Sequence, residues 1–111
     1  MNTYRRFVMD KLSKEKAADK LKQLNESWKL IDNSTKLQLT KEYASFADAV
    51  RFLGKVARCA EQEAHHPDLC VFDYNRLKIT LTTHDVGGLT DKDFLTAARF
   101  EEHLGVTIVG K

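Results

Sequence analysis

Three of the four histidines in this 111-residue chain lie between positions 65 and 84, at His65, His66 and His84. Imidazole is the side chain whose ordinary pKa, about 6.5, lets it both give and take a proton near neutral pH. If the fold brings these rings together, the cluster predicts acid–base chemistry. His103 has no partner that the sequence indicates, and we interpret it as structural.

Two acidic residues stand at spacings that let a carboxylate serve a histidine. Glu61 precedes His65 by four residues, so the two share a face if one helix includes both, and the carboxylate could then orient the ring. Asp93 follows Thr90 at the spacing of a helix capping box, which already gives it a complete structural explanation. Spacing alone favours neither a functional nor a structural interpretation of the histidines.

A zinc site is the alternative chemistry for this region, which offers four ligand side chains: His65, His66, Cys70 and His84. Adjacent histidines point in different directions on a regular element, and the sequence has no CxxC or HxxxH spacing. We therefore predict no metal. No nucleophile stands out, and no phosphate-binding glycine loop is present.

The first half of the chain predicts a helix followed by a hairpin. Ser13 can cap a helix that runs to about residue 25, with an apolar face at the helical spacing. Residues 27–31 and 35–40 have strand character, and the turn-forming sequence Asp32-Asn33-Ser34 separates them.

A long helix and a second hairpin follow. Ser45 and Asp48 have capping-box spacing and open a helix that runs to about residue 63, before Pro67. Residues 71–74 and 77–83 read as strands that turn near Asn75-Arg76, and a last helix runs from Thr90 to Leu104.

This order of elements predicts an α+β domain, α-β-β-α-β-β-α, whose four-stranded antiparallel sheet carries its helices on one face. His65 and His66 precede the second hairpin and His84 closes it. A hairpin brings the outer ends of its strands together, so the three side chains can converge.

Length and composition predict a single domain over residues 1–111, with residues 1–12 and 106–111 as flexible tails. The net charge of +2, from 18 basic and 16 acidic residues, is too small by itself to indicate a nucleic-acid or membrane partner, and we predict neither. The chain has no apolar run of about 20 residues. Two cysteines make no disulfide framework, and we expect a cytoplasmic protein.

Taken together, these residues resemble the pterin-4a-carbinolamine dehydratase family. The resemblance rests on Glu61-Gln62-Glu63-Ala64-His65-His66-Pro67 followed by Tyr74, His84 and Asp93, and it extends from about Ser13 to Leu104. The chain departs from the family pattern at Ala64, where an acidic residue is common, and at Leu69-Cys70, where Trp-Phe is common. It also carries one extra residue between Pro67 and Tyr74.

The resemblance implies an enzyme that dehydrates 4a-hydroxytetrahydrobiopterin to quinonoid dihydropterin. It implies a role in recycling the tetrahydropterin that aromatic amino acid hydroxylases consume, with no metal or redox cofactor, in a homodimer or homotetramer. His65 and His84 would transfer protons, and His66 would bind the pterin and assist. Asp93 would orient a histidine, while Glu61 would contact the pterin or orient His65. The implied substrate-binding residues are Glu61, His66, Tyr74, Thr82 and Thr83.

Two other functions compete with this interpretation. Some members of the family bind a transcription factor's dimerisation helices, and the apolar helix 46–60 could serve such a coactivator role. An open sheet face could bind RNA, but no glycine–aromatic signature accompanies Phe72 and Tyr74. Retention of all three histidines favours the enzyme, because a scaffold would not need them.

Overall fold

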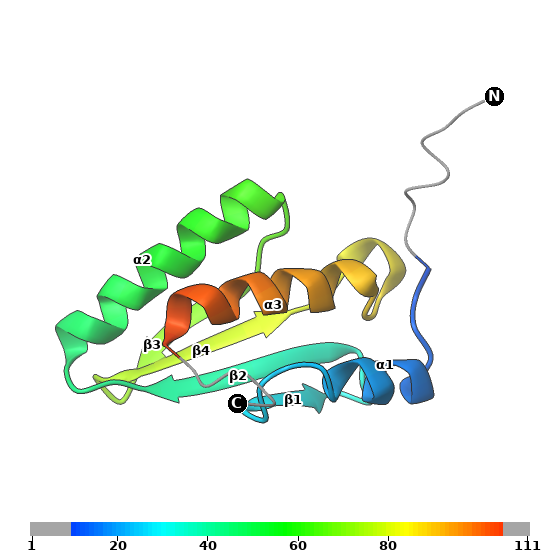
Figure 1. The fold of residues 1–111 in the computed structure, drawn as a ribbon, viewed down its shortest axis with the longest axis horizontal. Helices are drawn as coiled ribbons and strands as arrows, with labels where there is room; N and C mark the ends of the chain where they lie inside the picture. The colour runs from blue at the N-terminus through cyan, green and yellow to red at the C-terminus, as the bar shows by residue number, and fades with distance from the viewer. Residues whose placement is uncertain (1–9, 106–111) are drawn as a thin grey trace.

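The structure is a computed structural model, and it describes residues 10–105. The elements follow in the order α1 (Lys14–Leu21), β1 (Trp28–Ile31), β2 (Lys36–Glu42), α2 (Phe46–Glu63), β3 (Asp68–Phe72), β4 (Arg76–Leu81), the short 3₁₀ helix η2 (His84–Val86) and α3 (Asp91–Leu104). This order confirms the predicted α+β class (Figure 1).

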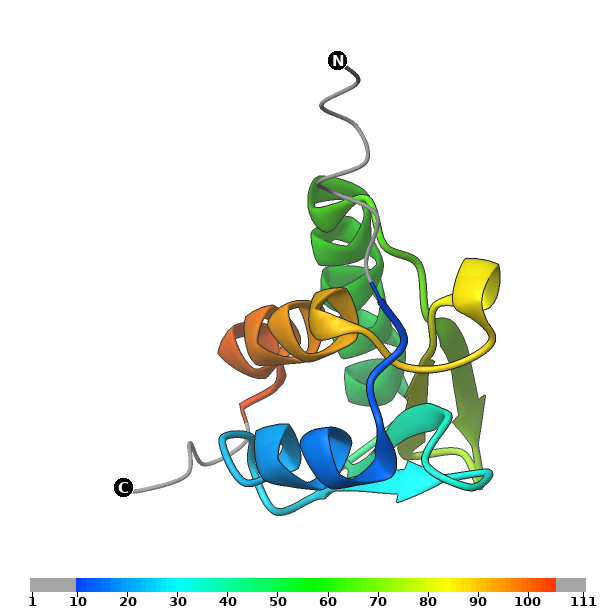
Figure 2. The same cartoon turned by 90° about the vertical axis from the view of Figure 1, so that its right-hand side faces the viewer.

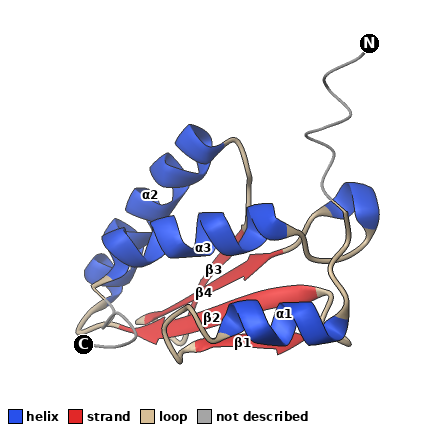
Figure 3. Ribbon diagram, turned by 45° about the vertical axis from the view of Figure 1, so that its right-hand side comes forward, coloured by secondary structure: helices blue, strands red, loops and turns tan. Residues whose placement is uncertain are grey.

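Within residues 10–105 the strands form one four-stranded antiparallel sheet in the order β1-β2-β4-β3. The two central strands pair with Leu39 opposite Ile79, and β3 pairs with β4 so that Asp68 lies opposite Thr80. The start of β3 and the end of β4 therefore meet at the same end of the sheet. Figures 2 and 3 show the three α-helices on one side of the sheet, as predicted.

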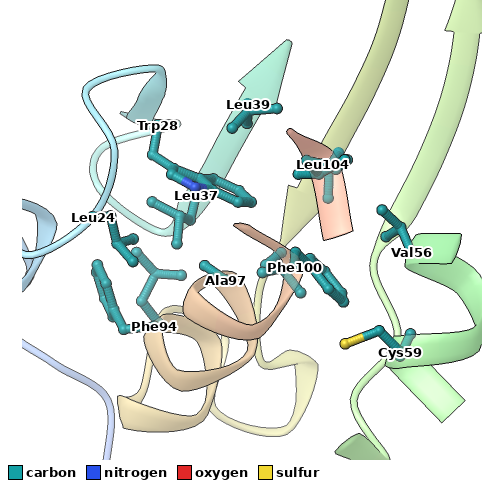
Figure 4. Close-up of a cluster of buried hydrophobic side chains, with 14 of the residues drawn as sticks. Leu24, Trp28, Leu37, Leu39, Val56, Cys59, Phe94, Ala97, Phe100 and Leu104 are labelled. Carbon is teal, nitrogen blue, oxygen red and sulfur yellow. The ribbon is translucent and has the colours of Figure 1, made fainter. Parts of the chain in front are cut away.

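The core lies between the sheet and the helices because the strands alternate apolar and polar residues. Leu77, Ile79 and Leu81 of β4 are fully buried, whereas Lys78 and Thr80 between them point to the other face and stay partly exposed. Trp28, Phe100 and Leu104 belong to the same buried cluster (Figure 4). Removal of this apolar surface from water is the main force that holds α3 on the sheet.

Serine caps begin the first two helices. The Ser13 hydroxyl accepts from the backbone N–H of Lys16 at 3.2 Å, and the Ser45 hydroxyl accepts from that of Asp48 at 3.1 Å. Asp48 was expected to complete a capping box, but its carboxylate accepts from the Arg51 guanidinium at 3.2 Å. The predicted cap at Ser45 is therefore present through its own hydroxyl.

Several predicted boundaries are wrong by a few residues. The helix α1 ends at Leu21, not near residue 25. The strand β3 begins at Asp68, three residues earlier than predicted, and ends at Phe72 because Asp73 and Tyr74 take positive φ angles of 47° and 53°. These left-handed residues form the turn, which the sequence placed near Asn75-Arg76.

The segment before α1 is held against the rest of the domain. The backbone N–H of Leu12 donates to the Leu89 carbonyl at 2.7 Å, and the Leu12 side chain packs on the core. The rest of the two predicted tails, residues 1–9 and 106–111, lies outside the described residues. None of the helices among residues 10–105 combines the length and the apolar character that crossing a membrane requires.

Candidate active site

The centre of the candidate site is a contact between His65 and Asp93. Helix α2 stops at Glu63, and Ala64 takes a left-handed conformation with φ of 54°, which turns the chain toward the start of α3. The Nε2 atom of His65 then lies 2.6 Å from Oδ1 of Asp93. The Asp93 side chain is 0% exposed and that of His65 is 13% exposed. Residues 28 positions apart are thus joined by a part-buried hydrogen bond.

Asp93 is held by the first turn of α3. Its Oδ2 accepts from the Thr90 backbone N–H at 2.9 Å, completing the predicted capping box, and from the Thr83 hydroxyl at 2.7 Å. The helix N-terminus favours a negative charge at this position. One carboxylate therefore caps the helix with one oxygen and contacts an imidazole with the other.

These contacts define which ring nitrogen of His65 is available for chemistry. An ionised carboxylate only accepts hydrogen bonds, so Nε2 carries the proton that faces Asp93, and the lone pair of the neutral ring stands on Nδ1. A proton taken up at Nδ1 gives an imidazolium that the Asp93 carboxylate stabilises. The pair has the arrangement of a base and the group that orients it.

The carboxylate of Glu61 pairs with His66, whereas the sequence spacing predicted a pair between Glu61 and His65. Its Nε2 lies 2.8 Å from Oε2 of Glu61, and both side chains are mostly exposed, at 61% and 75%. Helix α2 ends at Glu63, so Glu61 and His65 do not form the expected i, i+4 pair within one helix. Among residues 10–105 no hydrogen bond joins their side chains, and the exposed Glu61–His66 pair contributes little to stability. The role of Glu61 at the pterin stays a prediction.

His84 begins the 3₁₀ helix η2, directly after Thr83, and is exposed. Among residues 10–105 its ring has no hydrogen-bond or ion-pair partner. The link between His84 and the His65–Asp93 pair is its neighbour Thr83, which contacts the same carboxylate as His65. The three histidines lie at the end of the sheet where β3 begins and β4 ends, and the convergence of their rings stays a prediction.

The other predicted binding residues divide into two groups. The hydroxyl of Thr82 donates to the Thr35 carbonyl at 2.8 Å, and that of Thr83 contacts Asp93, so both lie at the histidine end of β4. Tyr74 is 66% exposed in the turn at the opposite end of the β3–β4 hairpin. At about 3.3 Å per strand residue, roughly 20 Å of β4 separates it from His84. The structure does not bring Tyr74 to the histidines.

Sequence reasoning missed the part that Thr90 plays. It was identified as a cap, yet its hydroxyl also lies 3.0 Å from that of Thr83. The signal in the sequence was that Thr90 is the N-cap of a helix that follows the Thr83 loop closely. This contact makes Thr90 part of the hydrogen-bond network around Asp93.

Neither a metal site nor a nucleophile emerges from the neighbouring side chains. Within the described part of the chain, no three His, Cys, Asp or Glu side chains converge to hold a metal ion, so the alternative set with Cys70 is not assembled. Burial, reinforced by Glu63, raises the pKa of the Cys59 thiol, although Arg99 opposes the shift. Cys59 is thereby disfavoured as a thiolate.

Three surface hollows lie elsewhere on the molecule. One of about 290 Å³ runs between α1 and α3 and includes Leu24, Phe94 and Leu95. A second continues from it past Leu12, and a third lies beside β1 and β2 around Ile31. None of these three is lined by a histidine.

Fold and site together define an α+β protein with a histidine–aspartate pair where its second helix, its last strand and its third helix meet. The model of the family described as Pterin 4 alpha carbinolamine dehydratase matches residues 10–103. The chain belongs to this family, which confirms the resemblance found in the sequence.

Relatives in other organisms agree with this assignment. A Chloroflexus aggregans protein is 43% identical over 97 residues, covering 87% of this chain and 100% of its own length. A Nitrosomonas eutropha protein is 39% identical over 90 residues, covering 81% of this chain and 77% of its own length. Both carry the name "Putative pterin-4-alpha-carbinolamine dehydratase".

Solved structures show the same fold. A Brucella melitensis protein titled "transcriptional coactivator/pterin dehydratase" superposes with a TM-score of 0.78 at 27% identity, covering 86% of this chain and 100% of its own. A pterin dehydratase-like protein described as a RuBisCO assembly factor in the alpha-carboxysome superposes with a TM-score of 0.61. The second superposition covers 74% of this chain and 94% of the other, and at 23% identity it shows a shared fold alone.

Proposed function

We propose that this protein dehydrates a 4a-hydroxytetrahydropterin to the quinonoid dihydropterin by histidine acid–base catalysis. The observation that carries the proposal is the 2.6 Å contact between His65 and the fully buried Asp93. Membership of the family and the names of the relatives support the reaction class. The physiological pterin is the tetrahydrobiopterin derivative in this proposal.

The reaction needs two proton movements. The bond between C4a and its hydroxyl oxygen breaks, and an acid supplies the proton with which the hydroxyl leaves as water. A base takes the proton from N5, whose electrons form the new double bond. His65, through Nδ1, and the exposed His84 serve as the two proton-transfer groups. Each such group typically accelerates a reaction by about 10²–10⁴-fold.

The remaining site residues serve the pterin and the histidines. His66 and Glu61, joined at the surface, contact the substrate together with Thr82, which directly follows the last residue of β4. Tyr74 is left out of the proposed site because it lies at the far end of the hairpin. The reaction as proposed uses no metal or redox cofactor, since only water and protons are exchanged, and it returns pterin oxidised by an aromatic amino acid hydroxylase to a reducible form.

The test is to generate 4a-hydroxytetrahydropterin in situ and to follow the quinonoid product spectrophotometrically. We expect the parent protein to accelerate product formation, and the double variant His65→Ala, His84→Ala to lose nearly all of this acceleration. His103→Ala is the matched control, because this exposed histidine lies in the last turn of α3. A double variant as active as the parent would show that the histidines do not carry the reaction.

A second role is favoured by one surface feature. Helix α2 exposes two apolar side chains one turn apart, Phe46 at 58% and Val50 at 44%. We propose that this surface joins copies of the chain into a homo-oligomer, the alternative being the coactivator type of partner binding. Sedimentation should show dissociation in Val50→Lys but not in the control variant Leu95→Lys, because Leu95 is an exposed apolar residue on α3. Unchanged sedimentation of both variants would exclude α2 as the interface.

A further inference from the structure

We propose that Thr83 is a positioning residue whose hydroxyl, acting through Asp93, fixes the orientation and tautomer of His65. This inference rests on the proposed function for its catalytic consequence. It replaces the expectation that Thr83 binds the pterin directly.

The hydroxyl of Thr83 is already committed within the protein. Its oxygen lies 2.7 Å from Oδ2 of Asp93 and 3.0 Å from the hydroxyl oxygen of Thr90. A threonine has one hydroxyl proton, and an ionised carboxylate can only accept, so Thr83 donates to Asp93 and accepts from Thr90. It has no proton left to donate to a substrate.

These bonds form a chain that runs in one direction. The backbone N–H of Lys92 donates to Thr90 at 3.2 Å, Thr90 donates to Thr83, and Thr83 donates to Asp93. The chain ends at Oδ2 of the Asp93 carboxylate, whose other oxygen, Oδ1, faces Nε2 of His65. Hydrogen bonds in such a chain polarise one another, so the last acceptor is strengthened as a partner for the imidazole.

Asp93 needs both donors on Oδ2 to hold this orientation. Its side chain has no contact with solvent, and among residues 10–105 the donors to Oδ2 are the Thr90 N–H and the Thr83 hydroxyl. Without the hydroxyl, a single backbone donor remains on that oxygen. The carboxylate can then rotate, and Oδ1 no longer points constantly at His65.

Thr83 also carries the second histidine of the proposed reaction. It is the N-cap of η2, whose first residue is His84, and its backbone N–H donates to the Gly88 carbonyl at 2.9 Å. The Thr83 carbonyl in turn accepts from the Gly87 N–H at 3.1 Å. The residue that holds Asp93 is therefore anchored on the same loop that sets the place of His84.

Its neighbour Thr82 does not share this role. The Thr82 hydroxyl donates to the Thr35 carbonyl at 2.8 Å and, among residues 10–105, makes no hydrogen bond to Asp93. Of the two threonines at this end of β4, the structure assigns the positioning function to Thr83 alone.

The experiment compares Thr83→Val, which removes the hydroxyl with little change of shape, with Thr83→Ser, which keeps it. In metal sites, partners that orient a functional imidazole account for about 10–100-fold in activity, and we expect a similar fall in kcat for Thr83→Val. KM should stay near the parent value, and Thr83→Ser should restore most of kcat. Thr96→Val is the matched control, because Thr96 is fully buried on α3 and its hydroxyl has no hydrogen-bond partner within residues 10–105.

A spectroscopic readout on the free protein separates this role from a merely structural one. Two-bond ¹H–¹⁵N spectra of the imidazoles should show His65 protonated at Nε2 in the parent, in Thr83→Ser and in Thr96→Val. The His65 signals should shift toward a mixture of tautomers in Thr83→Val. If Thr83→Val does not fold, Thr83→Ala serves for the same measurement.

The outcomes distinguish the two levels of the account. Unchanged His65 signals in a folded Thr83→Val protein, or a raised KM with unchanged kcat, would overturn the positioning role in favour of substrate binding. If the parent protein has no dehydratase activity, the proposed function fails, while the spectra still decide whether Thr83 controls His65.

Discussion

Replacing Asp93 by Asn changes the proton position on His65 while nearly preserving the shape of the site. The Asn carbonyl oxygen can still accept from the Thr90 N–H and the Thr83 hydroxyl. Its amide NH₂ then faces Nε2 of His65, where the parent has a carboxylate oxygen at 2.6 Å. The amide can only donate there, so Nε2 must accept and the ring proton moves to Nδ1.

The magnitude follows from the tautomer. With its proton on Nδ1, His65 cannot act as a base there, and the dehydration rate should fall by about 10²–10⁴-fold. The same substitution in the serine-protease triad, which also enforces the wrong tautomer, lowers kcat by about 10⁴-fold. Three hydrogen bonds to the carboxylate become neutral ones, at up to about 1 kcal/mol each, while the cost of burying a charge is removed. The melting temperature should fall by about 4–8 °C for each kcal/mol lost.

The assay is the dehydration rate at fixed protein concentration, with melting followed by circular dichroism. Asp91→Asn is the matched control, because Asp91 lies in the same helical turn but pairs with Lys20 at the surface. It loses the same charge at the helix N-terminus, yet should keep full activity. A folded Asp93→Asn protein with parental activity would refute the tautomer argument.

Three further predictions concern stability. Burial raises the pKa of Glu101 above its ordinary 4.5, although hydrogen bonding from the Asn25 N–H opposes this, so the folded state binds its proton more tightly than the unfolded chain. The stability that this proton contributes is present below pH 4.5 and is lost as the pH rises through the raised pKa. In urea titrations, the free energy of unfolding of Glu101→Gln should therefore rise relative to that of the parent toward neutral pH. A difference between the two proteins that does not change with pH would contradict this. Thr96→Val should raise the free energy of unfolding by about 1 kcal/mol, since a buried hydroxyl without a partner is removed, and a lower unfolding midpoint would contradict it. Burial raises the pKa of Tyr43 to about 12, although Arg51 opposes the shift, and the Tyr43 hydroxyl donates to the Leu104 carbonyl at 3.1 Å. Tyr43→Phe should therefore lower the free energy of unfolding by about 0.5–1.5 kcal/mol in the same titration. An unchanged unfolding midpoint would show that this hydrogen bond is not stabilising.

The sequence predicted those parts of the fold that local chemistry determines. Ser13, Ser45 and Thr90 each cap a helix, because a side-chain oxygen can satisfy a free backbone N–H at its start. Leu77, Ile79 and Leu81 alternate with polar residues along β4, and this alternation places one face of the strand in the core. Such features depend on residues a few positions apart, and their physical cause is visible in the sequence.

The parts that the sequence did not predict depend on where the chain turns. Ala64 carries no turn signal, yet its left-handed conformation ends α2 and directs His65 to Asp93 and His66 to Glu61. The turn at Asp73 and Tyr74 likewise removes Tyr74 from the expected strand. A pairing across 28 residues depends on the packing of α3 against α2, which periodicity alone does not specify.

The most direct measurement compares the parent protein with the single variant His65→Ala in the formation of quinonoid dihydropterin from 4a-hydroxytetrahydropterin. The account predicts a parental rate that rises in proportion to protein concentration, and a variant rate close to that in buffer, with α3 still folded around Asp93. A parent no faster than buffer, or a His65→Ala protein as fast as the parent, would contradict the claim that the imidazole held by Asp93 moves the proton.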